Sequence, residues 1–174
     1  MNKHNKIFLI GPMGAGKTTI GKQLAETQSL QFLDSDHEIE TRTGVTIPHI
    51  FDVEGEEGFR RREENMIDEL TQKQNIVLAT GGGAVIREIN RQHLKDRGTV
   101  IYLHAGIEQL LERTARDKNR PLLQTVNPRA KLEELMAVRE PLYREVADII
   151  IDTEEQPVAK VVKHILQKLQ ELPA

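Results

Sequence analysis

The feature that most constrains this fold is the stretch GPMGAGKTT, Gly11 to Thr19, which directly follows the apolar run Ile7 to Ile10. A Gly-x-x-x-x-Gly-Lys-Thr spacing after a strand and at the start of a helix is typical of a phosphate-binding loop. Glycines let backbone N–H groups turn inward around a phosphate, and the positive end of the following helix faces the same anion. Lys17 can then reach the terminal phosphates, and the Thr18 hydroxyl can join a magnesium shell. The alternative is an ordinary glycine-rich turn. The motif and its place between a strand and a helix instead predict a site for nucleotide phosphates, but they do not identify the reaction.

Short apolar runs alternate with long helical patterns along the whole chain. We predict strands at Ile7–Ile10, Gln31–Leu33, Ile76–Leu78, Val100–Leu103 and Ile149–Ile151. We predict helices over Lys17–Gln28, Gly58–Thr71, Ile107–Thr114, Pro128–Val146 and Val158–Leu172. Parallel strands need crossover helices, and continuous apolar runs indicate burial on both faces. We therefore expect one α/β domain over residues 1–174, with three α/β/α layers around a five-stranded parallel sheet.

Composition narrows the possible partners. The 24 basic and 27 acidic residues give a net charge of −3, so no global basic field favours nucleic acid, and 3% aromatic content supplies few base-stacking platforms. The absence of cysteine excludes disulfides and suits a reducing compartment, so we expect a cytoplasmic protein. No apolar run approaches the ~18 residues needed to span a bilayer, so we expect no membrane association.

Two stretches break the alternation of strand and helix. Residues 36–71 hold more helix than one crossover requires, so we expect part of them, about 36–62, to stand off the sheet as a substrate-binding cap. Residues 113–127 are rich in charge and bounded by Pro121 and Pro128. They are predicted to form a mobile lid, at about 112–124, over the sheet edge.

The second predicted strand ends in Asp34-Ser35-Asp36. At a strand terminus, two carboxylates spaced i, i+2 can both point toward the phosphate loop. One could hold magnesium through water while the other faces an acceptor hydroxyl. The alternative, that Asp36 caps a helix beginning at His37, is compatible with that role.

The stretch FRRRE, Phe59 to Glu63, places Arg60 and Glu63 on one face of a helix. Three adjacent arginines more often form a solvated surface, so this segment alone favours a structural interpretation. The other motifs of the sequence shift this interpretation toward a functional role.

The stretch TGGGA, Thr80 to Ala84, follows the third predicted strand, where a parallel sheet presents its ligand crevice. Three glycines would let a substrate lie directly on the backbone, although a simple turn remains the alternative. The predicted lid, RTARDKNRPLL, carries four cations between Arg113 and Arg120. A lid arginine can supply charge to a transferring phosphoryl group and help to exclude water.

Taken together, these segments resemble the shikimate kinases. These are small P-loop kinases, of the nucleoside-monophosphate-kinase-like group, that phosphorylate the 3-hydroxyl of shikimate on the route to chorismate. The resemblance covers nearly the whole chain and rests on an ordered set: GPMGAGKTT, DSD, FRRRE, GGGAV, RTARDKNRPLL and REPLYREVAD. It implies a P-loop kinase fold with a helical substrate-binding cap and a mobile lid, ATP as co-substrate, Mg²⁺, and a monomer.

The resemblance also implies roles for individual residues. Shikimate would be held by Asp36, Arg60, Gly82, Gly83, Arg139, Phe51 and Phe59. The ATP phosphates would be held by Gly14, Ala15, Gly16, Lys17, Thr18 and Thr19, with Arg120 on the phosphates, Arg113 on the base side and Gln156 at the adenine edge, where many relatives offer arginine. Magnesium would be held by Thr18 and Asp34, and the catalytic residues would be Lys17, Asp36 and Arg120.

Elementary chemistry agrees with these roles. Arg60 and Arg139 could clamp a carboxylate through charge-assisted hydrogen bonds. Asp36 could then select a hydroxyl, either as a base or by orientation alone, because a loose phosphoryl-transfer transition state gains most from position and charge.

Two other functions remain open at this point. One is a kinase for another small hydroxy acid, such as gluconate. The other is a nucleotide-binding regulator without an acceptor. The chain lacks the Asn-Lys-x-Asp loop of guanine-selective switches, and its switch-like Asp52-x-x-Gly55 lies in the predicted helical cap.

Overall fold

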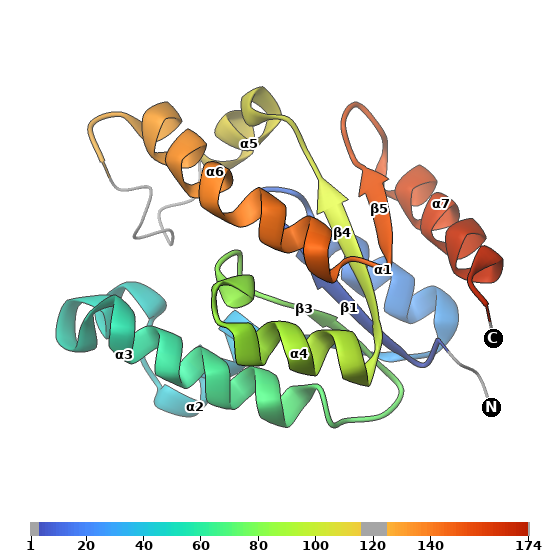
Figure 1. Ribbon diagram of the computed structural model, residues 1–174, viewed down its shortest axis with the longest axis horizontal. Coiled ribbons are helices and arrows are strands. Elements are labelled where there is room, and N and C mark those ends of the chain that lie inside the picture. The colour runs from blue at the N-terminus through green and yellow to red at the C-terminus, as the bar shows by residue number, and fades with distance from the viewer. Residues whose placement is uncertain (1–3, 116–124, 174) are drawn as a thin grey trace.

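A parallel sheet forms the centre of the computed structural model, which describes residues 4–115 and 125–173 (Figure 1). Its strands are β1 (Lys6–Ile10), β2 (Gln31–Asp34), β3 (Ile76–Ala79), β4 (Thr99–His104) and β5 (Ile149–Asp152). Their order is β2-β3-β1-β4-β5, and every neighbouring pair is parallel. The predicted five-stranded parallel sheet is confirmed, with each strand end within one residue of its predicted position.

Helices cover both faces of this sheet. They are α1 (Lys17–Gln28), α2 (Ser35–Thr43), α3 (Ile47–Leu70), α4 (Glu88–Arg97), α5 (Ile107–Thr114), α6 (Pro128–Val146) and α7 (Val158–Glu171), with a short 3-10 turn, η1 (Ala84–Ile86). One core cluster joins α1 and α7 to one face, through side chains such as Leu24 and Ile165. A second cluster joins α3, α4 and α6 to the other face, through side chains such as Leu70 and Leu94. The predicted three-layer arrangement is therefore confirmed (Figure 1).

Helices α3 and α4 differ most from the prediction. Helix α3 begins at Ile47 rather than Gly58, because Thr46 caps it by accepting from the His49 backbone N–H and Pro48 fits its first turn. Gly55, at φ 73° and ψ 178°, interrupts its helical geometry. Helix α4 was not predicted at all. Its buried residues are only Asn90 and Leu94, so its sequence carries little apolar periodicity.

The topology brings three polar loops to one edge of the sheet. The loops after β1, β2 and β3 carry the phosphate-loop motif, the aspartate pair and the triple glycine, and parallel strands end at the same edge. This edge is where an open α/β sheet binds its ligands. Within the described ranges, none of the helices is both long and apolar enough to cross a bilayer.

Candidate active site

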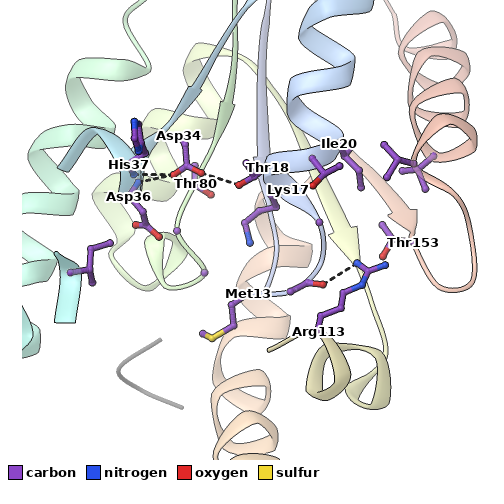
Figure 2. A pocket seen from close by; sticks show the side chains of 18 of the residues that line it. Met13, Lys17, Thr18, Ile20, Asp34, Asp36, His37, Thr80, Arg113 and Thr153 are labelled. Carbon is purple, nitrogen blue, oxygen red and sulfur yellow. Dashed lines mark hydrogen bonds between the residues drawn. The ribbon is translucent and has the colours of Figure 1, made fainter. Parts of the chain in front are cut away.

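A pocket of about 560 Å³ lies at this edge of the sheet. Ten predicted site residues line it: Gly14, Gly16, Lys17, Thr18, Thr19, Asp34, Asp36, Gly82, Arg113 and Gln156. Figure 2 shows the Lys17 side chain between the two aspartates on one side and Arg113 on the other. The volume is in the range of small-molecule sites, so one pocket brings the predicted phosphate, metal and acceptor residues together.

The phosphate loop has the backbone shape that its sequence predicts. Gly14 and Gly16 have φ of 86° and 95°, the left-handed region that glycine adopts at little cost. Lys17 is buried, and its Nζ donates to the carbonyl oxygens of Gly11 and Pro12 at 2.6 and 2.8 Å. The ammonium group is therefore held over the loop, where it can exchange these carbonyls for phosphate oxygens.

Asp34 accepts hydrogen bonds at both of its carboxylate oxygens. Oδ1 accepts from the backbone N–H groups of Asp36 and His37 at 3.0 and 3.2 Å, which makes Asp34 the N-cap of α2. The alternative in which Asp36 caps a helix starting at His37 is therefore wrong, because α2 starts at Ser35 and an N-cap must precede the first turn. Oδ2 accepts from the Thr18 hydroxyl at 3.0 Å (Figure 2).

The Thr18 and Asp34 pair suits magnesium. Mg²⁺ prefers oxygen ligands and usually keeps several waters, so one hydroxyl and one carboxylate are a sufficient protein contribution. Among the described residues, no group of three or more His, Cys, Asp or Glu could hold a metal by itself. A magnesium ion here would therefore depend on water and nucleotide oxygens as further ligands.

Asp36 faces the same pocket from the start of α2, close to the triple glycine. A Cβ on Gly81 would lie only 2.7 Å from Asp36 Oδ1 and 2.8 Å from Glu63 Oε2. Any side chain at Gly81 would therefore displace a carboxylate, which explains one glycine of the three. The Gly81 N–H also donates to the Ser35 hydroxyl at 3.1 Å and fixes the turn against α2.

Arg60 is buried on α3 and is paired with Glu63. Its Nη1 donates to Glu63 Oε1 at 2.9 Å, and both side chains are almost fully inaccessible. Burial raises the pKa of the Glu63 carboxyl, and the Arg60 guanidinium acts in the opposite direction. The Arg60 guanidinium also stands over the Phe59 ring, 5.2 Å from its centroid, and the Phe51 ring lies 5.0 Å from that of Phe59. The arginines of FRRRE are therefore not all surface residues.

Arg139 approaches the glycine turn from α6. It is 2% exposed, and burial lowers the pKa of its guanidinium, with Arg60 adding to that effect. A Cβ on Gly82 would lie 3.4 Å from Arg139 Nη1, and one on Gly83 would lie 2.5 Å from Arg60 Nη2. The two guanidinium groups therefore pack against consecutive glycines of the same turn.

The remaining predicted nucleotide residues are only partly described. Arg113 Nη1 donates to the Gly14 carbonyl at 3.0 Å, and Gln156 Nε2 donates to the Asp152 carbonyl at 2.9 Å. Both line the pocket, and Arg113 lies on the side away from the aspartates (Figure 2). Arg120 and most of the predicted lid, residues 116–124, lie outside the described residues.

A model of the shikimate kinase family matches residues 13–170 of this chain. The chain belongs to the shikimate kinase family. It is 60% identical over 167 residues to the shikimate kinase of Pseudomonas syringae pv. tomato, covering 96% of this chain and 97% of that protein. It is 54% identical to a shikimate kinase from Acinetobacter baumannii solved in complex with shikimate, with a TM-score of 0.94 over 95% of this chain and 93% of the other.

A gluconokinase from Sinorhizobium meliloti shares the fold but little sequence. Its TM-score is 0.64 at 18% identity, covering 98% of this chain and 94% of the other. At that identity the likeness extends to the fold alone. The contrast with the shikimate kinases means that nothing in the comparisons favours gluconate as the acceptor.

Six predicted site residues do not line the pocket of this shikimate kinase family member: Ala15, Phe51, Phe59, Arg60, Gly83 and Arg139. Ala15 is buried in the phosphate loop, and the others gather around the glycine turn. Sequence reasoning also missed Met13, which lines the pocket, and it left Glu63 and Tyr143 without roles. The i, i+3 spacing of Arg60 and Glu63 could have identified the ion pair, whereas no local signal points to Met13.

Proposed function

We propose that this protein transfers the γ-phosphoryl group of ATP to the 3-hydroxyl of shikimate, giving shikimate 3-phosphate and ADP on the route to chorismate. The observation that carries the proposal is the pair of buried arginines, Arg60 and Arg139, against a glycine turn beside Asp36 and the phosphate loop. Two adjacent guanidinium groups fit the carboxylate of a small acid, whereas a neutral sugar would offer them no negative charge.

The acid would be held by its carboxylate and one hydroxyl. Arg60 and Arg139 would bind the carboxylate, and the ring would lie on the backbone of Gly82 and Gly83, with Phe51 and Phe59 as apolar neighbours. Asp36 would accept a hydrogen bond from the reacting hydroxyl, orient it and take up its proton as the oxygen attacks. The A. baumannii relative, solved with shikimate, supports this class of ligand.

ATP would lie on the opposite side of the pocket. The loop from Gly14 to Thr19 would surround the phosphates, and Lys17 would turn from its own carbonyls to the phosphate oxygens. Arg113 and Gln156 would border the nucleotide, and Arg120 would reach it from the lid. Magnesium, held by Thr18 and Asp34, would neutralise charge on the phosphate oxygens when bound.

The lid and the cap complete the proposal. Residues 36–62 would close on the acid and residues 112–124 on the nucleotide, because phosphoryl transfer benefits from the exclusion of water. We further propose a cytoplasmic monomer without nucleic-acid or membrane partners. Size-exclusion chromatography with light scattering tests the oligomeric state.

A coupled assay of ADP release tests the activity directly. Purified protein with ATP and Mg²⁺ should release ADP on addition of shikimate, and the product should carry phosphate on the 3-oxygen by phosphorus-proton NMR. Gluconate at equal concentration serves as the matched acceptor control. No ADP release with shikimate from folded protein would overturn the proposal, and equal or faster turnover of gluconate would replace the substrate.

A further inference from the structure

The Tyr143 hydroxyl holds the backbone of the proposed acid site, although Tyr143 does not itself line the pocket. Tyr143 is fully buried on α6, one helical turn after Arg139, so both side chains leave the same face of the helix. Its hydroxyl donates to the Gly82 carbonyl oxygen. Burial raises the pKa of the Tyr143 phenol, and the nearby Arg139 guanidinium acts in the opposite direction. The phenol therefore ties the Gly82 peptide to α6, beside Arg139.

This hydrogen bond fixes the Gly82 carbonyl against α6. The position of a Gly82 Cβ lies 3.4 Å from Arg139 Nη1 and 3.4 Å from the Met13 backbone N, so the turn is packed between α6 and the phosphate loop. Glycine has no side chain with which to hold this position. The hydrogen bond from Tyr143 instead holds the Gly82 carbonyl oxygen. Because the peptide unit is planar, this bond also fixes the direction in which the neighbouring backbone N–H points.

We propose that Tyr143 is a positioning residue, whose hydroxyl holds the Gly82 peptide against α6 in the placement relative to Arg139 that an acid ligand requires. The inference rests on the proposed function. The residue acts through the Gly82 peptide rather than by touching the ligand. Loss of the hydroxyl should therefore weaken binding of the acid and leave the nucleotide side unchanged.

Tyr102 provides a matched control within the same core. It is also fully buried, its ring lies 4.9 Å from that of Tyr143, and its hydroxyl donates to Glu140 rather than to the glycine turn. Tyr102→Phe and Tyr143→Phe thus each remove one buried hydroxyl and one hydrogen bond from one stacked pair. Only the second removal reaches the proposed acid site.

Steady-state kinetics on the two variants test the proposal. Tyr143→Phe should raise the KM for shikimate by about 5- to 30-fold, the range expected when a buried carbonyl loses its hydrogen-bond partner. The KM for ATP should not change, and kcat should fall less than the KM for shikimate rises. Tyr102→Phe should keep the wild-type KM for shikimate. A Tyr143→Phe variant with wild-type KM for shikimate, or with both KM values raised in parallel, would overturn the inference.

A spectroscopic measurement covers the case in which Tyr143→Phe does not fold. The chain has two tyrosines and no tryptophan, so in Tyr102→Phe the only tyrosine is Tyr143. Shikimate should then perturb the near-ultraviolet absorption of that tyrosine, while gluconate should not. No perturbation at saturating shikimate would overturn the inference. Failure of wild-type protein to turn over shikimate would instead overturn the proposed function, so the two failures are distinguishable.

Discussion

Arg60→Lys separates a geometric role of the arginine from a purely electrostatic one. Arg60 uses Nη1 on Glu63 at 2.9 Å and approaches Glu56 with Nε at 3.4 Å, while Nη2 is the group nearest to Gly83. A guanidinium has five N–H donors in a rigid fork, so donors remain for a ligand carboxylate. Lysine keeps the positive charge beside the buried Glu63 but concentrates its donors at one point.

The magnitude follows from one lost hydrogen bond. A hydrogen bond between a guanidinium and a carboxylate contributes about 1.5–3 kcal/mol, so the KM for shikimate should rise by about 10- to 150-fold. The KM for ATP should not change, because Arg60 does not line the part of the site formed by the phosphate loop. The melting temperature should change little, since the pair with Glu63 keeps its charges.

Arg61→Lys is the matched control on the same helix. Arg61 is exposed, whereas Arg60 is 6% exposed, so the same chemical change occurs one residue away on the solvent side. Exposed charged side chains contribute little to stability, so this variant should retain wild-type kinetics. A coupled ADP assay measures both KM values for both variants. An unchanged KM for shikimate in Arg60→Lys, or a parallel rise in both KM values, would show that Arg60 does not hold the acid.

Three further outcomes follow from the same site. Lys17→Ala should lower kcat by about 100- to 1,000-fold, as expected for loss of one preorganised donor to the transferring group, and residual activity near wild type in the ADP assay would contradict this role. Gly83→Ala would place a Cβ 2.5 Å from Arg60 Nη2, so it should raise the KM for shikimate without raising that for ATP, and wild-type kinetics would count against the packing described. Burial raises the pKa of both tyrosines, Tyr102 and Tyr143, so in an absorbance titration neither should ionise near pH 10, where an exposed tyrosine is about half ionised. Because both pKa values are higher in the folded than in the unfolded protein, their contribution to folding stability is complete below about pH 10 and is lost as the pH rises above it. Half ionisation of the two tyrosines in folded protein at pH 10 would refute this prediction.

The sheet was predictable because each strand is a local apolar signal. Runs such as Ile76–Leu78 and Val100–Leu103 are buried on both faces, and the helices Lys17–Gln28, Ile107–Thr114 and Pro128–Val146 have their predicted bounds. Helix α4 was missed because it buries one apolar side chain, Leu94, and otherwise presents charge to solvent. Its formation depends on packing against α3 and η1, which no window of its own sequence contains.

The phosphate half of the site was predictable for a similar reason. Gly14, Lys17 and Thr18 belong to one continuous motif, and the sequence spacing already determines their geometry. The acid half is different, since Arg60, Gly82 and Arg139 come from three distant segments. The hydrogen bond between Tyr143 and Gly82 joins residues 61 positions apart. Such a contact exists only once the fold has formed, so no local pattern could have given Tyr143 a role.

The charges around the glycine turn suggest why the pocket would select an acid. Arg139 is buried with Arg60 close enough to lower its pKa, so the two cations repel each other in a site with little solvent. Glu63 offsets part of this repulsion through Arg60 Nη1, but its Oε2 has no hydrogen-bond partner among the described residues. A ligand carboxylate between the two guanidinium groups would relieve the remaining repulsion, whereas a neutral alcohol would only add desolvation. Selection for a negative charge would therefore be present in the protein before the acceptor hydroxyl reaches Asp36.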